Sequence, residues 1–155
     1  MNRTEQIISK IVSDRLLDIE NLQGCSENEV LDIEKNINTK LPDNYRSFLL
    51  LAGKGAGRLF SGTDIYFPRM LSLSEDANEL FSENGIPDLL PSNAFVFCMH
   101  QGYEVNYFLL DTDEDPKIIQ YIEGQGAPSL AWVSFSYFLE SSIHTHLKTW
   151  KDLNY

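Results

Sequence analysis

Apolar residues recur at three- and four-residue spacing in three stretches of the first third of the chain, and this spacing predicts amphipathic helices. The three apolar stripes are Ile7, Ile8, Ile11, Val12, Leu16 and Ile19; Val30, Ile33 and Ile37; and Tyr45, Phe48, Leu49 and Ala52. The second helix begins with a capping box, in which the Ser26 hydroxyl accepts from the Glu29 backbone N–H and the Glu29 carboxylate reaches back. Leu41 and Pro42 end it. We expect Pro42 as the first residue of the third helix and Gly53 as its C-cap.

Strand-like runs and turn residues replace the helical spacing over most of the chain after residue 53. The elements expected there are short strands at residues 58–60 and 63–67, a helix at 74–82, strands at 94–99, 104–111 and 117–123, and a closing helix at 134–149. The connections between the last three strands are too short for a parallel crossover, so these strands should form an antiparallel meander. The closing helix should cover one sheet face. The pattern predicts one α+β domain over residues 1–155, with N-terminal helices packed on a largely antiparallel sheet.

The net charge of −11, from 12 basic and 23 acidic residues, argues against binding to a nucleic-acid backbone. Between residues 70 and 147 there are twelve acidic residues and one basic residue, Lys117, whereas the remainder of the chain balances at eleven of each. The whole acidic excess therefore belongs to the second half. Such asymmetry is typical of a surface that meets a basic partner, and simple solubility explains it equally well.

Compartment and membrane association follow from what the sequence contains. The first residues lack the charged start, apolar stretch and cleavage site of a signal peptide. Apolar runs such as residues 48–52 are far shorter than the roughly 20 residues that cross a bilayer. Cys25 and Cys98 lie far apart in the sequence, which fits free thiols in a reducing compartment. We expect a cytoplasmic protein that does not insert into membranes.

Two stretches resemble ligand-binding loops without completing their motifs. Residues 53–57 read Gly-Lys-Gly-Ala-Gly, but they follow a helix instead of a strand and lack the G-K-[ST] of a phosphate loop, so we interpret them as a cap and turn. Residues 111–115 match the D-x-D-x-D opening of a calcium loop. However, Pro116 and Ile122 stand where that loop requires glycine and glutamate. An acidic hairpin turn is the better interpretation, and weak calcium binding remains open.

Catalytic and metal-binding constellations are poorly supported. Cys98 and His100 alternate along a strand, but His144 and His146 are two apart on a helix and do not face each other. We therefore expect no stoichiometric metal and no cofactor. Cys98 with His100 also lacks a nucleophile signature, so a buried strand cysteine is preferred. An enzyme is the third choice among the function classes.

Residues 26–53 combine a capped helix, the sequence Leu-Pro-Asp-Asn-Tyr-Arg-Ser-Phe-Leu at 41–49 and a glycine-rich turn that enters strands. This pattern resembles the SUKH superfamily, which contains fungal cell-wall assembly regulators of the Smi/Knr type and many bacterial immunity proteins that neutralise polymorphic toxins. Residues 60–67, 107–111 and 134–139 agree with the first strand pair, central strand and closing helix of that family.

The resemblance covers residues 25–147. The sequence departs from the family pattern at residues 98–102, where Met-His-Gln replaces a more glycine-rich turn. It implies a mixed sheet with helices against it, no catalytic residues and a surface for protein binding. Two functions follow as alternatives. The first is an immunity protein that blocks a cognate toxin of the nuclease type, and the second is a regulatory scaffold that binds signalling proteins.

A basic protein partner, such as a toxin, is expected to meet the acidic turn and neighbouring aromatic residues. Carboxylates at an interface rim raise the association rate, and tyrosines favour its centre. For any single tyrosine, a role in the core is at least as good an explanation. The predicted partner-binding residues are Tyr66, Tyr103, Glu104, Tyr107, Asp113, Glu114 and Asp115.

Overall fold

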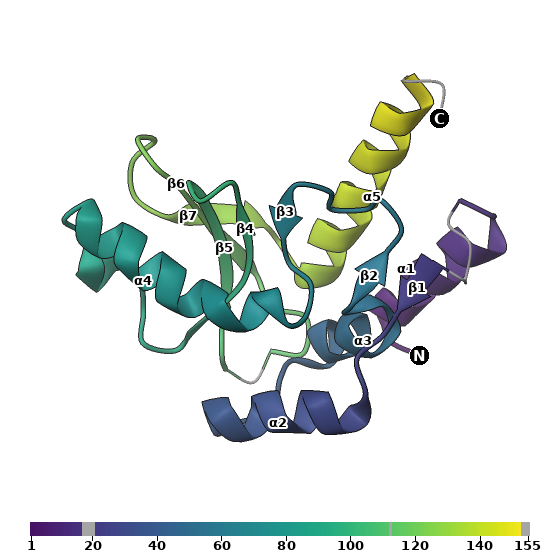
Figure 1. Ribbon diagram of the computed structural model, residues 1–155, viewed down its shortest axis with the longest axis horizontal. Helices are drawn as coiled ribbons and strands as arrows, with labels where there is room; N and C mark the ends of the chain where they lie inside the picture. Colours follow the sequence, from purple (N-terminus) through teal and green to yellow (C-terminus); the bar gives the residue numbers. More distant parts are fainter. Residues whose placement is uncertain (17–20, 112, 153–155) are drawn as a thin grey trace.

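The computed structural model describes residues 1–16, 21–111 and 113–152 (Figure 1). Its helices are α1 (Arg3–Ser13), α2 (Glu27–Ile37), α3 (Asp43–Ala52), α4 (Leu73–Glu83) and α5 (Phe135–Asp152), with 3-10 turns η2 (Arg69–Ser72) and η3 (Pro87–Leu89). Its strands are β1 (Leu22–Gln23), β2 (Gly55–Ala56), β3 (Thr63–Asp64), β4 (Ala94–His100), β5 (Glu104–Leu109), β6 (Ile118–Ile122) and β7 (Ser129–Trp132). The predicted α+β class is confirmed.

The main sheet has the strand order β3-β4-β5-β6-β7, and every pairing in it is antiparallel. The predicted meander is therefore confirmed as β4, β5 and β6. The sequence prediction missed β7, which pairs with β6 and has an exposed, uncharged pattern without a buried face. In the connection between β4 and β5, Gln101 and Gly102 both take positive φ angles. The resemblance to the family predicted more glycine here, and Gln101 is a non-glycine residue in a conformation that favours glycine.

Helices α1 and α2 begin at side-chain caps. The predicted Ser26 box is confirmed, because Ser26 Oγ accepts from Glu29 N at 3.1 Å and Glu29 Oε1 accepts from Ser26 N at 2.8 Å. A second capping box, Asn2 with Glu5, opens α1. Pro42 lies at the N-cap of α3, one position earlier than predicted. Helix α1 ends at Ser13, so Leu16 of the predicted stripe is exposed beyond it, and Ile19 lies outside the described residues.

The region after α3 contains less strand than the sequence predicted. Residues 58–60 are turn and not strand, and of residues 63–67 only Thr63 and Asp64 pair with β4. The reason is local, because Gly57, Phe60 and Gly62 all adopt positive φ angles that break an extended chain. The aromatic residues of this stretch therefore face the core from a loop.

An aromatic cluster fills the core between the sheet and α3 and α5. Tyr45 of α3 is fully buried, with ring centroids 5.3–6.0 Å from those of Phe95, Phe97 and Phe108 on β4 and β5, and 5.4 Å from that of Phe135 on α5. Edge-to-face geometry of this kind adds stabilisation beyond the area buried. The cluster therefore packs α3 and α5 against the β4–β5 strand pair.

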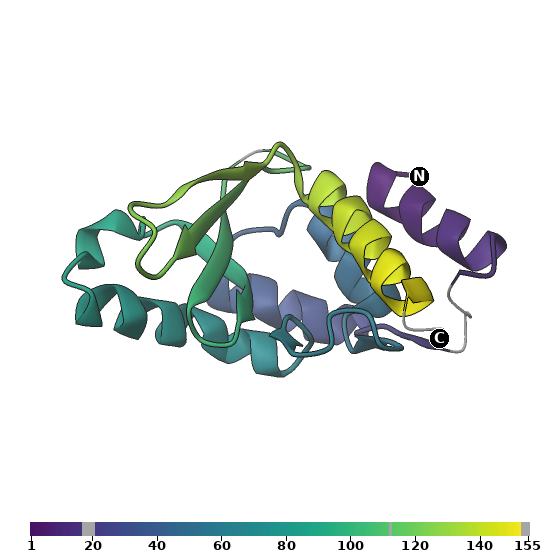
Figure 2. The same ribbon diagram turned by 90° about the horizontal axis from the view of Figure 1, so that it is seen from above.

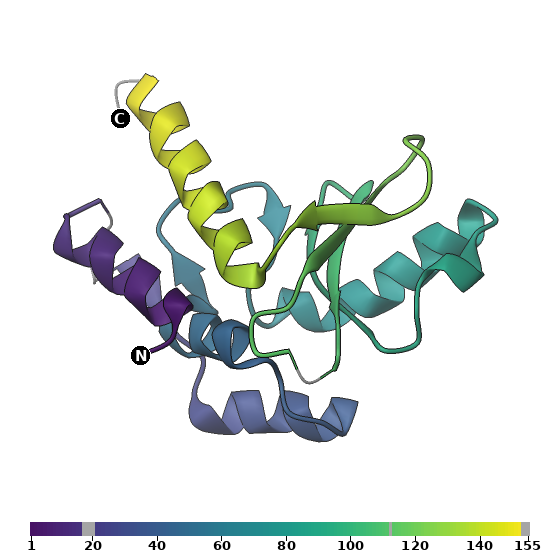
Figure 3. The ribbon, with the colours of Figure 1, turned by 180° about the vertical axis from the view of Figure 1, so that it is seen from behind.

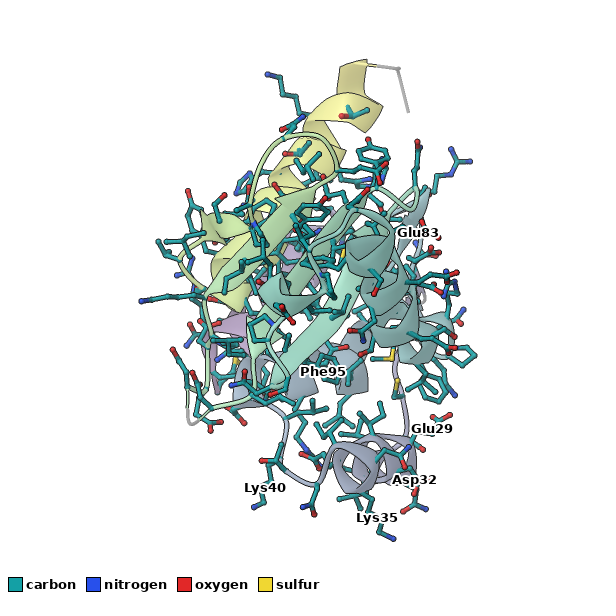
Figure 4. All side chains as sticks on the ribbon, turned by 90° about the vertical axis from the view of Figure 1, so that its left-hand side faces the viewer. Glu29, Asp32, Lys35, Lys40, Glu83 and Phe95 are labelled. Atoms are coloured by element: carbon teal, nitrogen blue, oxygen red, sulfur yellow. The ribbon has the colours of Figure 1, made fainter. Side chains whose placement is uncertain are left out.

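Helix α4 covers the opposite sheet face. Its Phe81 lies 4.6 Å, centroid to centroid, from Tyr121 of β6. Figure 2 shows α1, α3 and α5 grouped on one side of the sheet and α4 apart from them. Figure 4 shows α2 at the end of the molecule nearest Phe95, with Asp32 and Lys35 turned outward. Charged residues thus face solvent on α2, as its apolar stripe predicted.

Candidate partner-binding site

The acidic turn after β5 is engaged with the N-terminus of α5. Asp115 Oδ1 accepts from Ser136 N at 2.8 Å, and Asp115 Oδ2 accepts from Ser136 Oγ at 2.5 Å. The next N–H, that of Tyr137, donates to the side chain of Ser134 at 3.1 Å. The first N–H groups of a helix lack partners within the helix, and a carboxylate there also complements the helix dipole. Asp115 therefore acts as a tertiary cap of α5.

Glu114 performs the same task for α3. Its Oε2 accepts from Asp43 N at 2.9 Å, and its backbone oxygen accepts from both N and Nδ2 of Asn44, each at 3.0 Å. Helix α3 needs this help because Pro42, its N-cap residue, has no side-chain hydrogen bond to the helix. Asp113 is exposed, and among the described residues its carboxylate accepts only from Asp115 N within the same turn, at 3.0 Å.

The predicted tyrosines occupy three different environments. Tyr107 is 2% exposed and belongs to the core, where burial raises its pKa. Tyr66 is half-buried, donates its hydroxyl to the Leu59 carbonyl at 2.7 Å, and also has a pKa raised by burial. Tyr103, in the turn between β4 and β5, is 41% exposed and packs edge-to-face against His100. Of the three, Tyr103 presents the largest free surface.

The structure separates the predicted site residues into two groups. Tyr103 and Glu104 lie at the start of β5, whereas Asp113, Glu114 and Asp115 follow its end. At about 3.3 Å per residue, the six residues of β5 hold these groups roughly 20 Å apart. They do not form one contiguous acidic site.

A cleft opens beside Glu104, between the upper end of the sheet and the second half of α5. It has a volume of about 410 Å³. In Figure 1, α5 diverges from the strands toward the C-terminus, so this part of the sheet face lacks a helix packed flat on it. The cleft is lined by Arg58, Leu59, Phe60, Ser61, Thr63, Cys98, Glu104, Asn106, Trp132, Phe138, Ser141, Ser142, Thr145, His146 and Thr149.

A chain of amide hydrogen bonds orients Glu104 in this cleft. Gln120 Nε2 donates to Asn106 Oδ1 at 3.0 Å, and Asn106 Nδ2 donates to Glu104 Oε2 at 3.1 Å. Asn106 is 1% exposed, so the relay runs through the interior of the sheet. Among the described residues, no donor contacts Glu104 Oε1 and no basic side chain forms an ion pair with Glu104. The cleft thus contains a carboxylate that is held in place and retains acceptor capacity.

Cys98, at the base of the cleft, is not arranged for nucleophilic catalysis. It is 3% exposed, and burial, followed by the nearby Glu104 charge, raises the pKa of its thiol. His100 is committed elsewhere, with Nδ1 3.0 Å from Thr63 Oγ1. Burial also lowers the pKa of His146 on the opposite wall. These groups favour a binding surface over a reactive thiolate.

A second, smaller groove of about 290 Å³ lies on the other side of the β4–β5 turn. Arg69 bridges Asp64 and Asp76 there, at 3.4 and 2.8 Å, while Glu79 and Glu83 of α4 line the same groove. Figure 4 shows Glu83 at the edge of the molecule. The sequence prediction omitted these residues from the site, although the i, i+3 and i+7 spacing of Asp76, Glu79 and Glu83 would have placed them on one helix face.

The described residues contain neither a cluster of metal-ligating side chains nor a helix that could span a membrane. No three His, Cys, Asp or Glu side chains come together there in an arrangement that can hold a metal ion. The carboxylates of the candidate calcium loop instead accept backbone N–H groups, as in Asp111 from Asp113 N. Within the same described ranges, no helix is both long and apolar enough to span a bilayer.

The chain has N-terminal helices, then an antiparallel sheet, then the closing helix α5. This order agrees with a family model that matches residues 24–141. That model describes the SMI1/KNR4 family (SUKH-1). The chain belongs to the SMI1/KNR4 family. The match covers most of the chain and leaves α1 and the last part of α5 outside it. A comparison with curated proteins found no match. Family membership supports a protein-binding domain of the immunity or regulatory type.

Proposed function

We propose that this SMI1/KNR4-family protein is a non-catalytic immunity protein that binds and neutralises a basic toxin of the nuclease type. The observation that carries the proposal is the location of the acidic excess, which falls entirely on residues 70–147, the part of the chain that forms α4 and most of the sheet. A nuclease is basic where it grips phosphate. An acidic inhibitor is therefore steered to that surface and can occupy it.

The proposed contact surface is centred on the β4–β5 turn. Tyr103 supplies exposed aromatic area, and Glu104 supplies an oriented carboxylate in the neighbouring cleft. Gly102 of the same turn lines the groove that contains Glu79 and Glu83, so acidic side chains flank the turn on both sides. This arrangement suits a basic loop of the partner, with an arginine or lysine directed at Glu104.

Roles differ among the remaining residues of the predicted interface. Asp113, an exposed acid of the turn after β5, is proposed to affect association from the rim. Glu114 and Asp115 are proposed to support the site indirectly, because their carboxylates already cap helices. Tyr66 and Tyr107 are proposed to support it from the loop and the core.

A regulatory scaffold that binds signalling proteins is the second candidate, because the same family match supports it. Inhibition separates the two. An immunity protein abolishes the activity of its partner, whereas a scaffold binds without inhibiting.

The proposal is tested with the product of the neighbouring gene, provided that it encodes a large protein with a C-terminal toxin domain. We expect co-expression to restore growth, and purified protein to bind the toxin domain with an affinity that falls as salt rises. Glu104→Gln should weaken binding about tenfold, which corresponds to about 1.4 kcal/mol. Asp32→Asn on α2 removes the same charge from an exposed position outside the acidic half and serves as the matched control.

Three results would contradict the proposal. The first is no complex with the toxin domain. The second is a complex that leaves toxin activity intact, which would favour the scaffold. The third is an equal loss of affinity in Glu104→Gln and Asp32→Asn, which would leave only a general charge effect and remove Glu104 from the interface.

A further inference from the structure

Strand β7 forms an open edge of the main sheet. It pairs on one side with β6, and within the described residues no strand pairs with its other side. Figure 3 shows β7 as the strand nearest the viewer, with no helix in front of it. The opposite edge, β3, is only two residues long. An open edge presents unpaired backbone N–H and C=O groups to any extended chain that approaches.

The residues of this edge carry few of the usual protections against strand pairing, namely the short length of β7 and a register irregularity in its pairing with β6, between Ile118 and Ile119. Natural edge strands carry charges, proline or a covering segment. Here the sixteen residues 124–139 contain no charged residue, although 23% of the chain is charged. Pro128 precedes the strand, so all four residues of β7 keep their N–H groups. Leu130 and Val133 are 56% and 67% exposed. This edge is therefore both apolar and available.

We propose that the protein forms a homodimer in which β7 pairs antiparallel with β7 of a second copy. Two copies that each carry −11 charges repel each other wherever acidic surfaces meet. The uncharged segment between Glu123 and Glu140 allows the backbones to approach without placing carboxylates against each other. A two-fold axis through an antiparallel strand pair makes the contact self-complementary. Each contact between one residue of the first copy and another residue of the second copy is then repeated with the copies exchanged. Pairing joins two five-stranded sheets into one.

A second copy fits this edge better than the basic partner does. The edge offers no charge to attract a basic protein, whereas the β4–β5 turn and α4 do. The dimer and the toxin complex therefore use different surfaces. They also respond to salt with opposite sign, because salt screens repulsion between like-charged copies and screens attraction between opposite charges.

The test is sedimentation equilibrium of the purified chain over a range of micromolar concentrations, at low and high salt. We expect a mass that rises from 17.7 kDa toward twice that value, with tighter association at high salt. Leu130→Lys and Val133→Lys should each weaken dimerisation about tenfold or more, because a charge then lies within β7 or directly after it. Leu71→Lys is the matched control, since Leu71 is 51% exposed and lies away from the sheet edge, in η2.

The lysine variants distinguish edge pairing from a general charge effect. Each one lowers the net negative charge, so repulsion alone would make the variants associate more tightly than the wild type. Urea unfolding confirms that each variant is folded, which is expected because both side chains are exposed. A wild-type chain that stays monomeric at every concentration and salt overturns the proposal, and so does a dimer that Leu130→Lys leaves unchanged.

Toxin binding separates this inference from the proposed function. Leu130→Lys should leave toxin affinity unchanged, and Glu104→Gln should leave the dimer unchanged. If the wild type is monomeric and Leu130→Lys weakens toxin binding, the edge receives a strand of the partner and the dimer proposal is wrong. If the dimer forms as expected but no toxin is bound, the proposed function fails and the dimer stands.

Discussion

At one end of β5, the carboxylates of Glu114 and Asp115 accept backbone N–H groups from α3 and α5. At the other end, Glu104 accepts from a single amide and keeps one oxygen without a donor among the described residues. Both ends are acidic and next to turns. The difference shows that a carboxylate contributes to stability when its acceptors are filled from within the chain, and is free for recognition when they are not.

The largest effect is expected at Asn44, which ties the acidic turn to two helices. Its Oδ1 accepts from Thr4 N and Oγ1 at 2.9 and 2.8 Å, and its Nδ2 donates to the Glu114 carbonyl. Thr4 is fully buried, so Asn44→Ala leaves its polar groups without a partner. We expect a loss of about 3 kcal/mol in the free energy of unfolding, measured with urea. Asn78→Ala, at an exposed position of α4, should change it by less than about 0.5 kcal/mol.

Asp115→Ala and Glu104→Ala compare the two ends of β5 directly. Removing the tertiary cap of α5 should lower the free energy of unfolding by about 2 kcal/mol, because the N–H and hydroxyl of buried Ser136 lose their acceptors. Removing Glu104 should lower it by less than about 1 kcal/mol. The same urea experiment measures both. Equal losses would remove the distinction between a capping and a free carboxylate.

Alkaline pH should destabilise the cleft end through Cys98. Its folded-state pKa is raised above 9.0, the ordinary value, by burial and then by Glu104. The stabilisation is therefore fully present below pH 9 and is lost as pH rises, because the unfolded chain ionises first. Between pH 8 and 10 we expect a loss of about 1 kcal/mol from this thiol. Cys98→Ser should have a flatter dependence over that range, and an identical slope would exclude Cys98 as the cause.

Gln120→Ala should weaken partner binding indirectly, because Gln120 begins the chain of amide hydrogen bonds that orients Glu104. We expect toxin affinity to fall about threefold, or about 0.7 kcal/mol, in the wild-type background. In a Glu104→Gln background the same change should have no effect. A loss of equal size in both backgrounds would mean that Gln120 acts on stability or on another contact.

The smallest effect is expected for Asp113→Asn, at an exposed acid of the turn after β5 whose carboxylate does not cap a helix. It should slow toxin association slightly and flatten its salt dependence without changing the dissociation rate. Stopped-flow mixing at several salt concentrations measures both rates. An unchanged association rate would exclude the acidic turn from the interface. The proposed contact surface would then be limited to the β4–β5 turn and its surroundings.

Local sequence patterns predicted an element correctly where side chains close in sequence determine that element. The Ser26 capping box, the stripes of α2 and α3, the meander and the closing helix depend on side chains a few residues apart, and these predictions are confirmed. The short β7 was missed because its residues are exposed and show no alternation to detect. The strand predicted at residues 58–60 was wrong because the positive φ angles of Gly57, Phe60 and Gly62 interrupt the extended chain.

The sequence by itself determined the family, the α+β class and the acidity of the second half, since composition, order and spacing are properties of the chain. Only the tertiary structure decided which acids are free. Glu114 and Asp115 meet helices that begin 71 and 20 residues away from them, at Asp43 and Phe135, and no local spacing encodes such contacts. Glu104 depends likewise on a relay from the neighbouring strand. The availability of a carboxylate is set by which donors the fold brings to it, and that requires the packed structure.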